Sequence, residues 1–126
     1  MAQLLWVCLG GAVGTAARYG LTAWSLRAFG AAFPFGTLAV NVIGSFLMSL
    51  LMHVALATDR ISPVARVALA TGVLGGFTTY SSFNFETLLL AERGAWGLAA
   101  ANVAGTVAAC VLAGVAGLAV GRALFG

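Results

Sequence analysis

Charge is what this sequence has least of. Only 7% of its 126 residues are charged: lysine is absent, and the acidic side chains are Asp59, Glu86 and Glu92. A soluble domain normally carries about 25% charged residues. With 62% hydrophobic residues, the chain has too little polar surface to cover a water-soluble globule. We therefore expect an integral membrane protein surrounded by the lipid bilayer, with one domain as the default for this length.

Side chains that usually carry catalysis or hold metals are also scarce. His53 is the only histidine, and the two cysteines, Cys8 and Cys110, lie in apolar segments without metal-ligand or redox spacing. With no Ser/His/Asp set and no ligand cluster, an enzyme is not expected. The arginines form no basic cluster, and isolated arginines at helix ends usually anchor at the bilayer interface. The net charge of +3 therefore predicts no nucleic-acid partner.

Long hydrophobic runs, by contrast, fill most of the chain. A helix needs about 20 apolar residues to cross the hydrocarbon core. Four segments meet that need: residues 2–28, 35–57, 63–92 and 95–124. The connections are short, and Pro34 and Pro63 stand where a helix begins, a position that needs no backbone N–H. We predict an all-α membrane protein, a single four-helix transmembrane domain over residues 1–126.

Small residues are frequent within these segments, which contain most of the 17 glycines. Three pairs of glycines are spaced four residues apart: Gly10 and Gly14, Gly72 and Gly76, Gly117 and Gly121. Small residues at this spacing let membrane helices approach closely. The pattern predicts tight helix–helix packing.

The arginines do not fix which way the chain inserts. With four spans both termini face one side, which would hold Arg60, Arg66 and Arg122, while Arg27 and Arg93 face the other. Cytoplasmic loops normally show a clear excess of Lys and Arg, and three against two is almost none. This favours a chain that inserts in both orientations and pairs with an inverted copy. One orientation set by other signals is the alternative.

Residues 75–86 read GGFTTYSSFNFE, an unusual sequence inside a hydrophobic stretch. The segment 63–92 has 30 residues, about 45 Å as a continuous helix, which exceeds the ~30 Å hydrocarbon core. Its glycines and β-branched threonines weaken a helix, so we predict a break near residues 75–79. Broken helices present free carbonyls to cations in transporters. A glycine-lined packing notch is the alternative.

Polar side chains on three predicted spans suggest an uncharged lane for an anion. Tyr80 and Phe83 share a helix face, and aromatic ring edges carry partial positive charge. Asn41 adds an amide donor from the second span. The fourth span adds Asn102, Thr106 and Cys110 at four-residue steps. Donors without fixed charge bind an anion weakly at several sites, as conduction requires. The alternatives are that the rings pack in the core and that Asn41 hydrogen-bonds a neighbouring helix.

Arg18 and Glu86 are ionisable residues within predicted spans. Such residues are functional candidates by default. Both also lie near enough to a span end to reach the interface. The two interpretations stay open for both residues.

Three stretches together resemble the Fluc (CrcB) fluoride-channel family: GGAVGTAARYG at 10–20, FPFGTLAVNVIGSF at 33–46 and TGVLGGFTTYSSFNFE at 71–86. Their order and spacing agree with the family over the full length. The resemblance implies an antiparallel, dual-topology homodimer with two fluoride pores, a multi-pass protein of the bacterial inner (plasma) membrane. The implied activity is a passive, fluoride-selective ion channel that lets cytoplasmic fluoride leave down its electrochemical gradient.

The resemblance also implies roles for individual residues. Asn41 matches the pore asparagine, while Tyr80 and Phe83 take the places of two phenylalanines whose ring edges face fluoride. Gly75 and Thr78 match positions whose backbone carbonyls hold a central structural sodium ion at the dimer crossing. The hydroxyls of the break region are those of Thr79, Ser81 and Ser82. The family's polar track in the fourth helix falls on Asn102, Thr106 and Cys110.

Two further residues match the family, and two others depart from its usual pattern. Arg18 matches the family's basic residue near the end of the first helix, and Glu86 matches its acid after the motif. Tyr80 stands where phenylalanine is usual, which adds a phenol donor. Cys110 is a poorer donor than serine at the far end of the track.

A small proton-coupled multidrug exporter is the alternative from another functional class, since such proteins also have four helices and dual topology. They need a titratable carboxylate in the first span, and residues 2–28 contain no Asp or Glu. A holin-like assembly protein would leave the break motif and the buried amides unexplained.

Overall fold

The computed structural model describes all residues, 1–126, and contains only helices and their connections. Three helices are long: α1 (Ala2–Phe29), α2 (Phe35–Ala57) and α6 (Trp96–Phe125). Between α2 and α6 lie four shorter pieces: α3 (Pro63–Val67), the π-helical stretch η1 (Ala68–Leu74), α4 (Gly75–Phe77) and α5 (Tyr80–Glu92). The chain is therefore all-α, as predicted.

Local sequence explains where the helices end. Gly30 follows α1 with φ 76°, and Gly94 follows α5 with φ 78°, a backbone region that favours glycine. Pro63 occupies the first turn of α3, where no backbone N–H is needed. Ser62 caps that helix, because its hydroxyl accepts from the backbone N–H of Ala65 at 3.2 Å.

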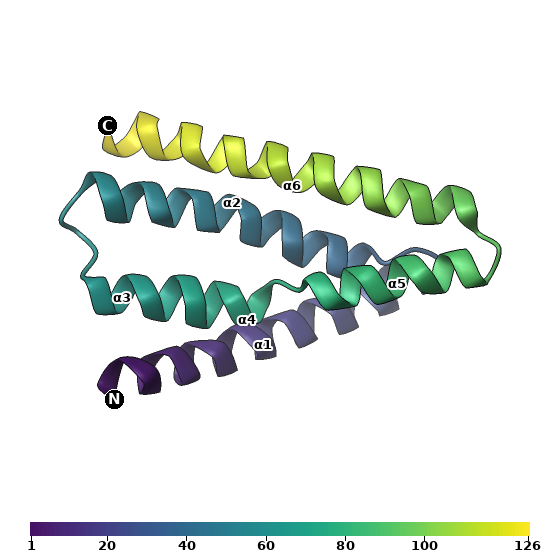
Figure 1. Cartoon of the computed structure of the whole chain (residues 1–126), viewed down its shortest axis with the longest axis horizontal. Coiled ribbons are helices and arrows are strands. Elements are labelled where there is room, and N and C mark those ends of the chain that lie inside the picture. The colour runs from purple at the N-terminus through teal and green to yellow at the C-terminus, as the bar shows by residue number, and fades with distance from the viewer.

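The helices run up and down in a flat stack (Figure 1). α2 lies between α6 on one side and the series from α3 to α5 on the other, while α1 runs obliquely below α3 and α4 and passes behind α5. Both termini and the connection from α2 to α3 lie at one end of the molecule. The other two connections lie at the opposite end.

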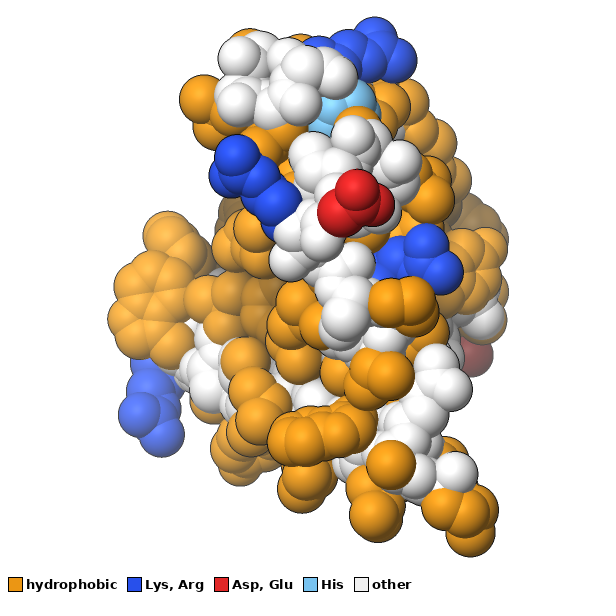
Figure 2. All heavy atoms as spheres, turned by 90° about the vertical axis from the view of Figure 1, so that its left-hand side faces the viewer, with side chains coloured by type: hydrophobic (Ala, Val, Ile, Leu, Met, Phe, Trp, Pro, Cys, Tyr) orange, Lys and Arg blue, Asp and Glu red, His pale blue; other side chains and the backbone are white.

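Three helices, α1, α2 and α6, are long and apolar enough to cross a membrane. The predicted span 63–92 is divided instead among shorter pieces, and the longest of these, α5, has 13 residues. Large hydrophobic side chains such as Trp6 and Leu112 are exposed along the outside. Figure 2 shows the end with the termini, where single charged side chains are scattered over a mainly hydrophobic surface.

Glycines make the closest contacts between helices. A Cβ at Gly72 would lie 2.8 Å from the carbonyl oxygen of Val7, and a Cβ at Gly76 would lie 2.6 Å from that of Gly11. On the other side of the stack, a Cβ at Gly117 would overlap the carbonyl of Phe46 on α2. The predicted close packing at the spaced glycines is confirmed: α1 packs on η1 and α4, and α6 packs on α2.

Candidate functional site

The helical path stops for two residues between α4 and α5. Thr78 and Thr79 have extended backbones, with φ −87° and ψ 158° for Thr78 and φ −153° and ψ 121° for Thr79. Both are β-branched, which suits an extended backbone. Gly75 still has helical angles, so the interruption occupies only the last two residues of the predicted range 75–79. The Thr79 hydroxyl caps α5 by accepting from the backbone N–H of Ser82 at 3.3 Å.

Asn41 of α2 binds the peptide backbone at this interruption. Its Nδ2 donates to the Thr79 carbonyl at 2.9 Å, and its Oδ1 accepts from the Thr79 N–H at 2.8 Å. The amide therefore substitutes for the helical partners that Thr79 lacks. A carboxamide has two N–H donors, and only one of them is used in this pair, so one remains for a ligand.

The backbone carbonyls of Gly75 and Thr78, beside the interruption, accept no hydrogen bond. In a continuous helix the Thr79 N–H would reach the Gly75 carbonyl, but that N–H donates to Asn41. The Ser82 N–H, which would reach Thr78, donates to the Thr79 hydroxyl instead. The neighbouring Gly76 carbonyl accepts from Arg18 Nε at 3.0 Å.

A groove of about 540 Å³ lies beside the interruption, between α2, α5 and α6. Seven of the predicted site residues line it: Asn41, Thr78, Thr79, Tyr80, Phe83, Thr106 and Cys110. The rings of Tyr80 and Phe83 meet edge-on, with centroids 5.7 Å apart and planes at 63°. Tyr80 is 79% exposed in the single chain, whereas Phe83 is 9% exposed. No charged side chain lines the groove.

The remaining predicted residues lie elsewhere. Ser81 is exposed on α5. Asn102 is 1% exposed and does not line the groove. Its Nδ2 donates to Thr87 Oγ1 at 2.8 Å, and its Oδ1 accepts from Thr106 Oγ1 at 3.3 Å. Thr87 is not among the residues predicted from the sequence. Its position one helical turn after Phe83, on the same face of the helix, is the feature that could have indicated it.

A second hollow of about 230 Å³, here called the Arg18 hollow, lies on the other side of the interruption. The predicted residues that line it are Arg18, Thr79, Ser82 and Glu86. Thr79 lines both this hollow and the groove. The structure therefore brings Arg18 and Glu86 together, but apart from the aromatic pair of the groove.

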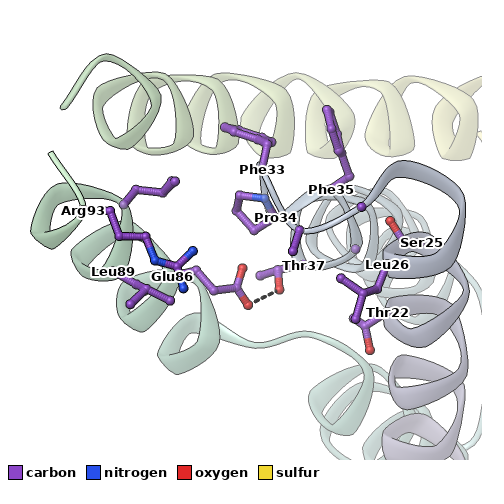
Figure 3. A pocket seen from close by; sticks show the side chains of 14 residues that line it. Thr22, Ser25, Leu26, Phe33, Pro34, Phe35, Thr37, Glu86, Leu89 and Arg93 are labelled. Carbon is purple, nitrogen blue, oxygen red and sulfur yellow. Dashed lines mark hydrogen bonds between the residues drawn. The ribbon is translucent and has the colours of Figure 1, made fainter. Parts of the chain in front are cut away.

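A third cavity of about 250 Å³ lies under the connection between α1 and α2. Figure 3 shows the Glu86 carboxylate pointing at Thr37 and the Arg93 side chain reaching into the same space. The Thr37 hydroxyl donates to Glu86 Oε1 at 2.7 Å, while Oε2 has no partner. Glu86 and Thr37 line both this cavity and the Arg18 hollow, so the Glu86 carboxylate lies between the two spaces.

The groups gathered here can bind small ions. No group of three or more His, Cys, Asp or Glu side chains comes together that could hold a metal ion. The groove offers hydroxyls, one free amide hydrogen and ring edges, which suit a small anion. The free carbonyls of Gly75 and Thr78 suit a cation, because hard cations prefer oxygen ligands.

Known proteins resemble this chain in sequence over nearly its whole length. Residues 5–118 match the family described as "CrcB-like protein, Camphor Resistance (CrcB)". A Sorangium cellulosum protein named "Fluoride-specific ion channel FluC" is 55% identical over 124 residues, which cover 98% of each chain. A protein of that name from Anaeromyxobacter sp. (strain K) is 56% identical over 92% of each chain. Another, from Agrobacterium fabrum, is 46% identical over 99% of this chain and 100% of its own.

These relatives are named as ion channels, not enzymes, which agrees with the expectation that this chain is not an enzyme. Channel relatives and three long apolar helices together indicate a membrane protein. The resemblance inferred from the three sequence stretches is confirmed over nearly the whole chain. The chain belongs to the Fluc (CrcB) family.

Proposed function

We propose that this chain forms a passive, fluoride-selective channel that lets cytoplasmic fluoride leave through the bacterial inner membrane. Its relatives carry the name of a fluoride-specific channel. The observation that carries the proposal is the groove, where Asn41, Tyr80 and Phe83 meet beside a two-residue interruption. The chain also lacks the feature that the alternative, a proton-coupled exporter, requires, since α1 contains no Asp or Glu.

The lining of the groove explains how a small anion would pass. Fluoride would exchange water for the free N–H of Asn41, the hydroxyls around Thr79 and the ring edges of Tyr80 and Phe83. None of these donors carries a full charge, so no single position holds the ion tightly. Weak binding at several positions allows rapid passage. Thr106 and Cys110 would continue the lane along α6, as the resemblance implies; in the single chain the hydroxyl hydrogen of Thr106 goes to Asn102.

The proposed assembly is a homodimer with an inverted copy, in which α3, η1, α4 and α5 form one interrupted membrane span. Tyr80 is 79% exposed in the single chain, and a partner would cover this open side of the groove. Non-helical backbone at membrane depth is tolerated only where protein or water surrounds it. A partner across the interruption would supply that protein.

The proposed dimer would hold a structural sodium ion where the interruptions of the two inverted copies meet. The carbonyls of Gly75 and Thr78 accept no hydrogen bond, and two inverted copies would place four such carbonyls around one cation. Oxygen ligands are what a hard cation prefers. The ion would hold the two chains together at the interruption and would take no part in fluoride passage.

Liposomes containing the purified protein test the proposal. We expect fluoride to leave the vesicles, as measured with a fluoride electrode, while chloride stays inside. Phe83→Ile should reduce fluoride efflux by about tenfold or more, because an aliphatic side chain has no ring edge to face the anion. Equal efflux of fluoride and chloride would contradict the proposed selectivity. Unchanged fluoride efflux in a folded Phe83→Ile protein would show that the Phe83 ring has no role in fluoride passage.

A further inference from the structure

A buried relay of hydrogen bonds runs behind the groove. Thr106 donates to Asn102 at 3.3 Å, Asn102 donates to the Thr87 hydroxyl at 2.8 Å, and Thr87 donates to the Phe83 carbonyl at 2.8 Å. The relay begins and ends at residues that line the groove, Thr106 and Phe83, whereas Asn102 and Thr87 do not line it.

The relay lies largely out of solvent, and the single hydrogen of each hydroxyl sets its direction. Asn102 is 1% exposed, and Thr106 and Phe83 are 7% and 9% exposed. Thr87 has one hydroxyl hydrogen, which goes to Phe83, so its oxygen is left to accept from Asn102. Each member depends on the next, because a buried polar group without a partner is costly.

The relay also fixes how α5 sits against α6. The bond between Asn102 and Thr87 is the only side-chain hydrogen bond that joins these two helices. The other bond from α5 to a neighbouring helix joins Glu86 to Thr37 of α2. Phe83 and Thr87 lie one turn apart on the same face of α5, so a rotation of α5 that separates Thr87 from Asn102 also moves the Phe83 ring.

We propose that Thr87 and Asn102 are positioning residues for Phe83, holding its ring edge in the groove without touching the ion. The inference rests on the proposed function. It gives Asn102 a different role from the lane donor that the resemblance implies, since its amide is 1% exposed, does not line the groove and bonds to Thr87 and Thr106 inside the protein. Of the three predicted polar residues of α6, Thr106 and Cys110 line the groove.

Single-channel recording in planar bilayers separates positioning from mere support of folding. The current through one open channel does not depend on how many molecules fold. Thr87→Val keeps the shape of the side chain but removes the hydroxyl. We expect its fluoride current per channel to fall by about tenfold, since a displacement of about 1 Å in an oriented site can cost a hundredfold.

Two matched variants complete the experiment. Thr87→Ser keeps the hydroxyl and should restore the current per channel to within about twofold of wild type. Thr58 makes the same kind of bond one turn back, to Val54, but joins no second helix, so Thr58→Val should leave the current unchanged. If Thr87→Val does not fold, the double variant Thr87→Val, Asn102→Leu is recorded instead. It removes both partners of the bond between Thr87 and Asn102, a change that proteins tolerate better than the loss of one.

The outcomes are distinct. Wild-type channels that carry no fluoride current overturn the proposed function and this inference together. If wild-type channels conduct and Thr87→Val carries the same current per channel, the inference alone is overturned. The same holds for the double variant if that is the one that folds. A reduced current in Thr87→Val that Thr87→Ser restores supports it.

Discussion

At the scale of single residues, Asn41 combines two tasks. Its carboxamide pairs with both the N–H and the carbonyl of Thr79, residues 38 apart in the chain. It also lines the groove, where its second N–H has no partner. One side chain thus stabilises the interruption and presents a donor to the space beside it. Substitutions here change both the backbone geometry and the chemistry of the lining.

Asn41→Asp tests both tasks, since it keeps the shape but exchanges N–H donors for a carboxylate oxygen. The Thr79 carbonyl loses its donor, at a cost of about 1–3 kcal/mol, and an anion in the groove meets a negative charge. We expect fluoride efflux from liposomes to fall by at least about tenfold. Asn84→Asp is the matched control, because Asn84 is exposed and lines none of the three spaces described. Equal efflux from both variants would exclude Asn41 from the lane.

Residue spacing predicted part of this site. Tyr80 and Phe83 share a helix face, as their spacing predicted, and the structure adds that their rings meet edge to face. Asn102, Thr106 and Cys110 are also regularly spaced, but each four-residue step turns about 40° around a straight helix. Asn102 therefore faces α5 while Cys110 faces the groove. Which member of such a series turns away depends on the neighbouring helix, and that neighbour cannot be read from spacing.

At the scale of elements, hydrophobic runs with proline and glycine at their ends predicted where helices lie. The observed bounds of α1, α2 and α6 differ from the predicted ranges by at most one residue at each end. The location of the interruption within 75–79 was less determined. It depends on Asn41, which binds Thr79 from another helix. The glycines of this segment stay helical, and Gly72 and Gly76 pack against α1.

The contact between α1 and η1 should be sensitive to a single methyl group. A Cβ at Gly14 would overlap the Val73 carbonyl and lie 2.9 Å from the Phe77 nitrogen. We expect Gly14→Ala to destabilise the protein by about 1–3 kcal/mol, because backbone atoms cannot move aside cheaply. Thermal unfolding in detergent, followed by circular dichroism, measures the loss.

Gly11→Ala is the control on the same helix. Its Cβ would come no closer than 4.0 Å to any atom of a neighbouring helix. Replacing a helical glycine by alanine at an open position is neutral or mildly stabilising. If Gly14→Ala melts at the same temperature as Gly11→Ala, the close packing of α1 on η1 is not what stabilises this part of the molecule.

At the scale of the whole molecule, charge is spread evenly between the two ends. Both termini and the connection between α2 and α3 share one end, and the other two connections share the opposite end (Figure 1). The first end carries Arg60, Arg66 and Arg122, and the second carries Arg27 and Arg93. Figure 2 shows the first end, where the basic side chains stand singly. This distribution favours insertion in both orientations.

Reporter fusions at the C-terminus test that hypothesis. We expect signal from both sides of the membrane in the wild type. Because positive charge is retained on the cytoplasmic side, Arg122→Gln should lower the fraction of chains with a cytoplasmic C-terminus. Arg93→Gln, at the opposite end, should raise that fraction. Signal from one side only, unmoved by either substitution, would show that other features set the orientation.

The bond between Asn41 and Thr79 has a consequence for biosynthesis. The helix that carries the amide leaves the ribosome well before the threonines, because the two residues are 38 positions apart. The polar backbone at the interruption thus meets a ready partner as it enters lipid, where each unsatisfied group costs several kcal/mol. A circular permutant in which α2 is translated last would expose those groups to lipid during insertion, so its yield should suffer even though every native contact remains possible.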